Sequence, residues 1–179
     1  MILVISVCND SFHYFEFVRP IEDIINDAGQ NFISINYKEI TQDILKKIDK
    51  IIICGTSLKD NAFLEDIKCF DWIKECNKPL LGICAGMHII SLVHNGKLKN
   101  IQEIGLTQIE FLKDFFEIKD TIEVYELHNF YVESKEFEII AKSKQCPQVI
   151  ANKKMPHYAV LFHPEVRNKA IIKNFIKNS

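Results

Sequence analysis

The stretch Pro79-Leu-Leu-Gly-Ile-Cys-Ala-Gly-Met-His-Ile-Ile90 runs from an apolar segment directly into a helical pattern, with Cys84 at the junction. Gly82 and Gly86 flank the cysteine two residues away on either side, which gives the pattern G-x-C-x-G. A nucleophile elbow holds its nucleophile in strained backbone geometry, so these neighbours must be small. The helix that follows points its N-terminus at the sulfur and favours the thiolate. The stretch therefore predicts a strand, a tight turn with a reactive cysteine, and a helix, with the backbone N–H of Ala85 facing a developing oxyanion.

Around this elbow, apolar runs rich in Ile and Val alternate with amphipathic patterns. The first half predicts strands at residues 2–7, 32–36, 50–54 and 80–83, and helices at 17–28, after Thr41 and at 64–75. Strands that are apolar throughout are typical of a parallel sheet covered on both faces. The second half predicts strands at 103–111, 121–128, 137–142, 148–151 and 158–162, and a final helix at 167–177. We therefore expect one α/β domain over residues 1–179, with a mixed, mostly parallel central sheet flanked by helices in flavodoxin-like layers.

Composition limits the function classes. The 179 residues are 47% hydrophobic, which is enough for one sizeable core. With 22 basic and 24 acidic side chains the net charge is −2, and only two of the basic residues are arginine, so we expect no nucleic-acid partner. No apolar run approaches the ~20 residues that span a bilayer, so we expect no membrane association. The six irregularly spaced cysteines, without a secretion signal, predict reduced thiols in a cytoplasmic protein and no metal site.

A second motif supplies the base that a thiolate nucleophile needs. Near the C-terminus the chain reads Tyr158-Ala-Val-Leu-Phe-His-Pro-Glu165. In an extended segment, residues two apart share a face, so His163 and Glu165 can lie side by side. The carboxylate can then accept from one ring nitrogen and leave the other facing Cys84. The sequence predicts a Cys-His-Glu triad.

With both motifs, the chain resembles the class I (triad-type) glutamine amidotransferases over nearly its whole length. The resemblance rests on the elbow, a loop after the third strand, the E-x-G segment Glu103-Ile-Gly105, and Phe162-His-Pro-Glu165. It implies that Cys84 attacks the side-chain amide of glutamine, that ammonia leaves, and that water hydrolyses the glutamyl thioester. It also implies that His163 moves the protons, that Glu165 holds it, and that no cofactor is needed. The C-terminal quarter is most similar to the separate amidotransferase subunit of archaeal-type GMP synthases, which implies an ATP-dependent synthetase partner that aminates XMP.

Three positions depart from the family pattern. The loop that usually reads G-G-P is Cys54-Gly-Thr-Ser57, so the oxyanion donors implied by the family fall on Gly55 and Thr56, beside Ala85. Because Thr avoids a positive φ, we expect that this hole needs a partner to form. His88 stands where the family has a glutamine that binds substrate. The segment Leu127-His-Asn-Phe130 keeps the family's histidine but loses its acids, and His128, Asn129 and Phe130 are candidates for substrate contact.

Three functions remain open. The first is a glutaminase subunit that delivers ammonia to a separately encoded synthetase. The second is a stand-alone γ-glutamyl hydrolase that uses the same triad, which the residues at Thr56 and His88 would fit. The third is a non-catalytic regulatory subunit that retains the fold.

Overall fold

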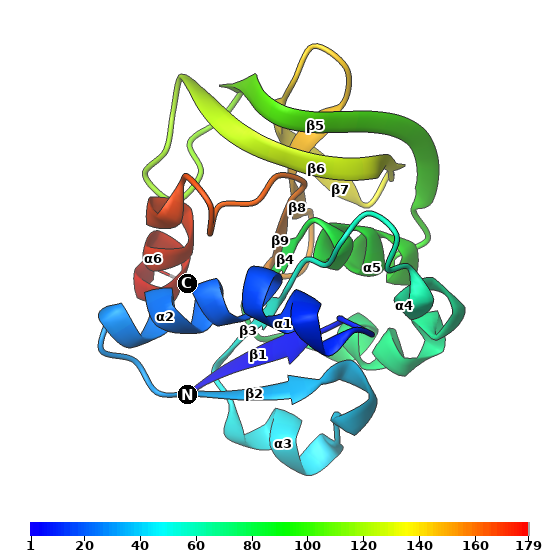
Figure 1. Cartoon of the computed structure of the whole chain (residues 1–179), viewed down its shortest axis with the longest axis vertical. Helices are drawn as coiled ribbons and strands as arrows, with labels where there is room; N and C mark the ends of the chain where they lie inside the picture. The colour runs from blue at the N-terminus through cyan, green and yellow to red at the C-terminus, as the bar shows by residue number, and fades with distance from the viewer. Residues whose placement is uncertain (179) are drawn as a thin grey trace.

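Buried Ile, Leu and Val side chains form the first strands of the computed structural model, which describes residues 1–178 (Figure 1). The strands are β1 (Ile2–Ser6), β2 (Phe32–Asn36), β3 (Lys50–Ile53), β4 (Leu80–Ile83), β5 (Lys97–Phe111), β6 (Thr121–Glu133), β7 (Phe137–Lys142), β8 (Pro147–Asn152) and β9 (His157–Val160). The helices are α1 (Ser11–Phe17), α2 (Arg19–Asp27), α3 (Gln42–Lys47), α4 (Ala62–Glu65), α5 (Ala85–Val93) and α6 (Lys169–Asn178), with 3-10 helices η1 (Tyr37–Glu39) and η2 (Ile67–Glu75).

These strands form one sheet in the order β2-β1-β3-β4-β9-β8-β7-β5-β6. The pairs from β2 to β9 are parallel, and those from β9 to β6 are antiparallel. The predicted α/β sheet flanked by helices is confirmed, but the expectation of a mostly parallel sheet is wrong. The short connections of the second half leave no room for crossover helices, so those strands return antiparallel. The limits 1–179 for a single domain stay a prediction.

Helices cover both faces of the parallel half. Alternate residues of β1 point to opposite sides: Ile2 and Val4 pack with α2 and α6, whereas Leu3 and Ile5 pack with η2 and α5. Figure 1 shows α1 and α2 in front of β1, with α6 beside α2. Each face of this half of the sheet is thus a hydrophobic layer, which explains why its strands are apolar throughout.

Two predicted helices are divided in the structure. The pattern at 17–28 becomes the end of α1 and then α2, because Val18 breaks the helix and Pro20 lies in the first turn of α2. The pattern at 64–75 becomes the short α4 followed by the 3-10 helix η2. The predicted cap is confirmed: Thr41 accepts a hydrogen bond from the backbone N–H of Ile44 at the start of α3.

Strands β5 and β6 form a long antiparallel ribbon above the rest of the molecule (Figure 1). Both strands extend beyond their predicted limits, because residues 97–100 pair with residues 130–133. The register shifts between Asn100 and Glu103. Within the residues that the structure describes, no helix has the length and hydropathy needed to cross a membrane.

Candidate active site

Cys84 occupies the turn between β4 and α5 with φ of 48° and ψ of −101°, in the left-handed region that a side chain rarely adopts. Its backbone N–H donates to Val160 O over 2.8 Å, which ties the turn to β9. Its carbonyl accepts from the N–H of Met87, the first turn of α5. The predicted elbow is therefore present: Cys84 has a strained backbone conformation, and hydrogen bonds on both sides of it hold the turn.

The two flanking glycines are required by contact. A Cβ on Gly82 would lie 2.6 Å from the backbone of Gly86, and a Cβ on Gly86 would lie 2.4 Å from Ile53 O. The second distance is shorter than any van der Waals contact between carbon and oxygen. The glycines thus let α5 approach β3 and β4 closely enough to direct its N-terminus at Cys84.

His163 and Glu165 form the predicted pair. The Nδ1 atom of His163 lies 2.7 Å from Oε1 of Glu165, and both side chains are buried. The ring therefore donates from Nδ1 to Glu165, whether it is neutral or charged. Its Nε2 atom makes no hydrogen bond of ordinary geometry within residues 1–178 and is left for Cys84. Burial opposes the charged ring, but the charges of Glu165 and Cys84 outweigh it and raise the pKa of His163 well above its ordinary value.

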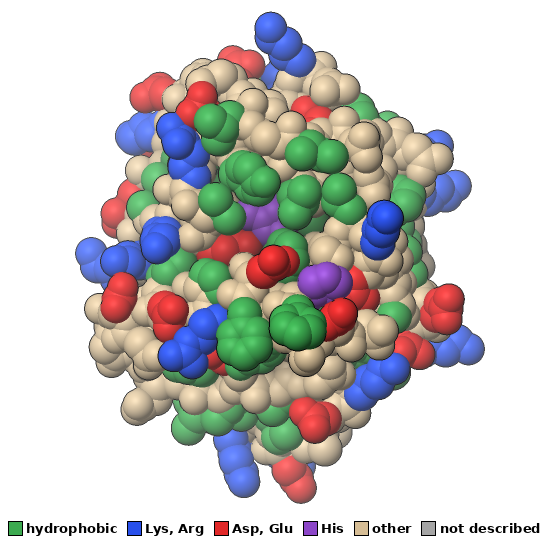
Figure 2. All heavy atoms as spheres, viewed as in Figure 1, with side chains coloured by type: hydrophobic (Ala, Val, Ile, Leu, Met, Phe, Trp, Pro, Cys, Tyr) green, Lys and Arg blue, Asp and Glu red, His purple; other side chains and the backbone are tan. Residues whose placement is uncertain are grey.

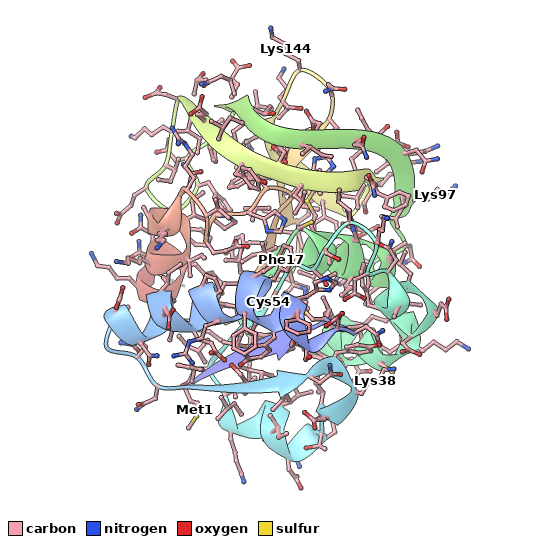
Figure 3. All side chains as sticks on the ribbon, in the orientation of Figure 1. Met1, Phe17, Lys38, Cys54, Lys97 and Lys144 are labelled. Carbon is pink, nitrogen blue, oxygen red and sulfur yellow. The ribbon has the colours of Figure 1, made fainter. Side chains whose placement is uncertain are left out.

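Gly55 shows how closely the triad converges. A Cβ on Gly55 would lie 2.7 Å from Cε1 of His163 and 3.4 Å from Cβ of Cys84. The ring of Phe17 packs against the ring of His163 with 5.3 Å between centroids. In Figure 3, Phe17, at the end of α1, and Cys54 are labelled near the middle of the molecule. A side chain at position 55 would displace the base, so the loop after β3 must have glycine there.

Strand β6 contributes its backbone to the site. It is the last strand of the sheet, so one of its edges is unpaired and offers free carbonyls. Tyr125 O accepts from the backbone N–H of His163 over 2.9 Å, and Leu127 O accepts from the Cys84 thiol over 3.5 Å. Phe130 O lies 3.1 Å from Nε2 of His88. The edge strand therefore contacts His163, Cys84 and the helix that follows Cys84 together.

The proposed oxyanion loop is held by a carboxylate that the sequence did not point to. Oδ2 of the buried Asp60 accepts from Thr56 Oγ1 over 2.9 Å and from Asn9 N–H over 2.8 Å, and it lies 3.2 Å from Nδ1 of His13. Burial opposes the charged carboxylate, but these hydrogen bonds and the charge of His13 outweigh it and lower the pKa of Asp60. In the described chain neither Gly55 nor Thr56 has a positive φ, so the threonine fits this loop without strain.

The predicted substrate contacts surround the nucleophile. A cavity of about 20 Å³ is lined by Thr56, Ser57, Leu58, Asp60, Asn61, Phe63, Cys84, Ala85, His88, Leu127, His128, Asn129 and Phe130. The set contains all four residues predicted to contact substrate. The cavity holds about one water molecule, so a glutamine side chain enters only if its walls move apart.

Each predicted contact residue is engaged within the protein. Burial lowers the pKa of His88 to about 4, so the ring is neutral and donates from Nε2 to Phe130 O. Asn129 donates to Leu58 O over 3.2 Å and accepts from Gln102 over 2.7 Å, which links the ribbon to the loop after β3. The buried His128 lies between Glu103 and Glu126, with its Nε2 atom 3.3 and 3.2 Å from their carboxylates.

The remaining cysteines differ from Cys84. Cys54 is fully buried, and burial raises the pKa of its thiol well above the ordinary value. Burial also raises the pKa of Cys8, Cys76 and Cys146. Cys69 is exposed on η2. None of these five lies at a strained turn beside the His163–Glu165 pair, so the structure singles out the same cysteine as the elbow pattern.

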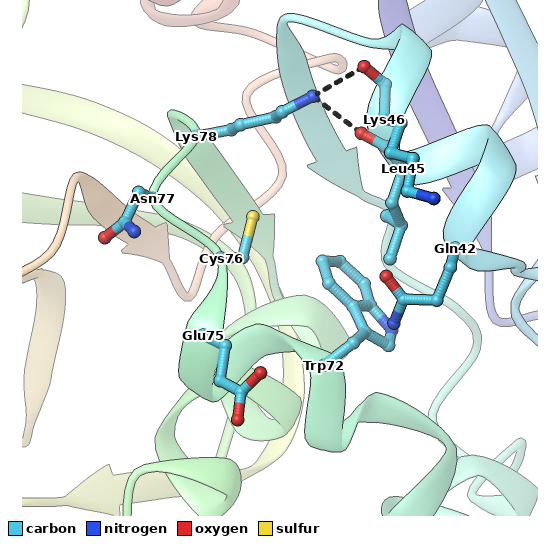
Figure 4. A pocket seen from close by; sticks show the side chains of 8 residues that line it. All are labelled: Gln42, Leu45, Lys46, Trp72, Glu75, Cys76, Asn77 and Lys78. Carbon is cyan, nitrogen blue, oxygen red and sulfur yellow. Dashed lines mark hydrogen bonds between the residues drawn. The ribbon is translucent and has the colours of Figure 1, made fainter.

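A larger hollow lies away from the triad. Its volume is about 390 Å³, and it opens between α3 and η2, with Gln42, Trp72, Glu75 and Cys76 among its walls (Figure 4). Lys78 crosses one side and donates to Leu45 O over 2.6 Å, which satisfies carbonyls at the end of α3. The ammonium group of Lys78 on the wall of this hollow therefore has a structural role. The described residues that line the hollow include no nucleophile paired with a base.

Sequence reasoning missed Asp60, Glu126 and the carbonyls of β6. Asp60 carried one usable signal, its spacing of four residues from Thr56 in a loop with other polar residues. Glu126 and His128 alternate on one face of a strand, which places both toward the same side. The carbonyls have no sequence signal, because every residue carries one.

The class I glutamine amidotransferase family model matches residues 13–179. The GMP synthase [glutamine-hydrolyzing] of Francisella philomiragia is 31% identical over 160 residues, which cover 82% of this chain and 31% of that protein. The corresponding protein of Wigglesworthia glossinidia brevipalpis is 30% identical over 91% of this chain and 35% of its own length. The chain thus spans about a third of the length of these curated relatives.

Two solved structures share the fold. A putative GMP synthase subunit from Thermoplasma acidophilum has a TM-score of 0.86 at 23% identity, covering 98% of this chain and 92% of its own. A glutamine amidotransferase from Thermotoga maritima has a TM-score of 0.73 at 19% identity, covering 98% and 81%. With the elbow at Cys84 and the family match over residues 13–179, the chain belongs to the class I glutamine amidotransferases, a family of glutamine-hydrolysing enzymes.

Proposed function

We propose that this chain hydrolyses glutamine to glutamate and ammonia and passes the ammonia to a separate ATP-dependent synthetase that aminates XMP. The observation that carries the proposal is the convergence of Cys84, in its strained turn, with the buried His163–Glu165 pair. The synthetase reaction rests on the GMP synthase relatives and on the Thermoplasma acidophilum structure.

The arrangement supports an acyl transfer through a thioester. Cys84 Sγ attacks the carbonyl carbon of the glutamine side chain, and the thiol proton passes to Nε2 of His163. The same proton then goes to the departing nitrogen, so that ammonia leaves and the glutamyl thioester remains. Water attacks the thioester with His163 as the base, which releases glutamate and restores the thiol. Glu165 holds the ring and stabilises its charged form in both halves.

Oxyanion stabilisation would come from the backbone. Ala85 begins α5, so its N–H has no acceptor within the helix and is free for an anion at the substrate carbon. Gly55 and Thr56 lie on the loop after β3, where Gly55 contacts His163 and Thr56 lines the same cavity as Ala85. Two backbone donors at the reacting carbon are the arrangement that stabilises a tetrahedral intermediate.

Two features support a synthetase partner. The cavity at Cys84 is far smaller than glutamine, so some event must open it. Large hydrophobic side chains are exposed on the elements beside the site, Phe12 and Phe15 on α1 and Ile104 and Leu106 on β5. Figure 2 shows hydrophobic side chains gathered around histidines on this face. Clusters of this kind mark surfaces where another protein binds.

The test measures glutamate release by the wild-type protein alone and with an ATP-dependent, XMP-aminating synthetase. We expect slow release alone, faster release with the synthetase, and no release by Cys84→Ala. Cys69→Ala changes an exposed cysteine outside the site and should retain the wild-type rate. A glutamine-analogue electrophile, diazo-oxo-norleucine, should label wild-type protein and Cys69→Ala but not Cys84→Ala. Unchanged release by Cys84→Ala contradicts the proposal.

A stand-alone γ-glutamyl hydrolase is the second candidate, favoured by one observation. His88 donates its ring N–H to Phe130 O and therefore does not offer substrate the amide that the family's glutamine provides. Rapid hydrolysis of a larger γ-glutamyl amide without any partner, with poor use of glutamine, would select this function. If no adduct forms with or without the synthetase, the retained fold serves a regulatory role.

A further inference from the structure

Strand β5 is tied to the rest of the sheet at one end only. Its ladder with β7 consists of the pairs Glu110–Lys142 and Phe111–Ala141, whereas its ladder with β6 runs along almost the whole strand. Away from this ladder, the ribbon is held over the site by the backbone hydrogen bond from His163 N–H to Tyr125 O and by side chains. A cluster beneath the ribbon provides such a connection.

The cluster joins three segments of the chain. Glu103 comes from β5, His128 from the facing position of β6, and Cys146 from the turn between β7 and β8. The three side chains are buried, and one ligand atom from each lies within 4.8 Å of the other two. Glu103 Oε2 is 3.3 Å from His128 Nε2 and 3.2 Å from Cys146 Sγ.

These distances fit one metal ion. A tetrahedral zinc with bonds of about 2.0 Å to nitrogen and oxygen and 2.3 Å to sulfur has ligand atoms roughly 3.3–3.6 Å apart. Thiolate, imidazole and carboxylate together are ligands typical of Zn²⁺. Gln148 donates to Glu103 Oε2 over 2.8 Å and Gln145 donates to Oε1 over 3.3 Å, so the carboxylate is oriented by neighbours as metal ligands usually are.

A second observation concerns the charges of the cluster. Glu126 and His128 are buried, and within the part of the chain that the structure describes neither oxygen of Glu126 and neither ring nitrogen of His128 makes a hydrogen bond of ordinary geometry. Glu126 Oε2 lies 3.2 Å from His128 Nε2 and so faces the same point. A buried carboxylate without a hydrogen bond is costly unless a cation neutralises it. The carboxylates of Glu103 and Glu126 therefore share one ring nitrogen, and a divalent cation at this point would balance both charges.

We propose that Glu103, His128 and Cys146 bind a divalent transition metal of the Zn²⁺ class that fastens the β5–β6 ribbon to the β7–β8 turn, with the Glu126 carboxylate beside it. Binding replaces the thiol proton of Cys146 and requires the neutral ring of His128. Because His128 also lines the cavity at Cys84, the ion would hold one wall of the active site in place. The site does not depend on the proposed glutaminase activity.

The test starts from full-length protein stripped with EDTA and dialysed with Zn²⁺. We expect about one zinc per chain by elemental analysis and a higher Tm than in the stripped protein. With Co²⁺ in place of Zn²⁺, we expect a thiolate-to-metal charge-transfer band. Cys146→Ser should weaken binding by roughly tenfold or more and abolish the band. Cys69→Ser, at an exposed cysteine, should retain both.

Two results would overturn the site. In the first, the wild-type protein holds no more zinc than Cys146→Ser, and zinc does not change its Tm. The cluster would then be held by a protonated His128 between its carboxylates. The second is zinc that disappears in Cys84→Ser and persists in Cys146→Ser, which would place the ion at the nucleophile. Zinc content, Tm and the Co²⁺ band are also measured on the wild-type protein, so the test remains decisive if one variant folds poorly.

Discussion

The Nδ1 atom of His163 lies 2.7 Å from Oε1 of Glu165, two residues along the chain, and neither group is exposed to solvent. Residues 164–166 form a turn in which the backbone N–H of Val166 donates to His163 O over 3.2 Å, and Pro164 fixes its own φ within this turn. The carboxylate therefore sets both the tautomer and the orientation of the base. This relationship determines the first prediction.

Glu165→Gln should lower kcat for glutamine hydrolysis roughly 10³-fold, because the amide neither stabilises the imidazolium nor enforces the Nδ1–H tautomer. KM should change little, since the residue does not line the cavity. Steady-state assays of glutamate release give both constants. Glu110→Gln, at an exposed position of β5, serves as the control. A kcat within threefold of wild type would mean that the pair is structural.

Gly86→Ala should destabilise the protein even though alanine is the better helix former. The added Cβ would lie 2.4 Å from Ile53 O, so β3 and α5 must separate, at a cost of roughly 1–3 kcal/mol in the free energy of unfolding. Urea denaturation measures this change. Glutaminase activity should also fall, because Cys84 moves with the helix.

Gly29→Ala is the control for this substitution. A Cβ at Gly29 meets nothing within 4 Å, and only its φ of +68° opposes the change. It should lose about 1 kcal/mol of stability and no activity. If Gly86→Ala is as stable and as active as wild type, the close contact between α5 and β3 is not needed.

Asp60→Asn should lower kcat/KM for glutamine about tenfold. Asp60 Oδ2 holds Thr56, Asn9 and His13 at once, and an amide can replace only part of that set. The oxyanion loop would then lose its fixed position. Asp66→Asn makes the same chemical change at a carboxylate that contacts Tyr37 and Lys38, away from the cavity, and should leave kcat/KM unchanged. Equal effects of the two variants would refute a role in positioning.

The protein should lose stability in acid through His157. Its Nε2 donates to Cys76 O over 2.7 Å and its Nδ1 lies 3.2 Å from Nε2 of His94, so the folded state needs the neutral ring. Burial lowers the pKa of His157 to about 4, below the value near 6.5 expected in the unfolded chain. The contribution is therefore complete above pH 6.5 and is lost as pH falls toward 4, on the order of 3 kcal/mol.

Urea unfolding at a series of pH values from 7 to 4 checks this prediction. His157→Asn should be less stable than wild type at pH 7 but should lose less stability on acidification. His88 contributes with the same sign, because burial also lowers its pKa to about 4, so some acid sensitivity will remain. A variant with the full wild-type dependence on pH would show that His157 is not responsible.

Local sequence patterns predicted the features that depend on residues only a few positions apart in the chain. The elbow at Cys84, the cap at Thr41 and the side-by-side placement of His163 and Glu165 follow from spacing and residue type within a few positions. The family match confirms the class that these motifs indicated. Each of these features depends on contacts between near neighbours in the sequence.

The prediction of a mostly parallel sheet was wrong, because the direction of each strand depends on how segments far apart in the chain pair. The prediction for the long ribbon was too short for a related reason: residues 97–100 are mostly polar, and their pairing with β6 makes them part of a strand. Val18 likewise ends α1, where the periodicity alone continues.

The sequence by itself thus determined the family and pointed to Cys84 with the His163–Glu165 pair, because these features lie in short motifs that fold locally. Only the tertiary structure decided what surrounds them. The carbonyls of Tyr125 and Leu127 reach the site because β6 is an edge strand, and Asp60 reaches Thr56 because the loop turns back. Glu103, His128 and Cys146 meet across three segments. Such contacts join residues far apart in the chain, and no local pattern encodes which of many polar residues will meet.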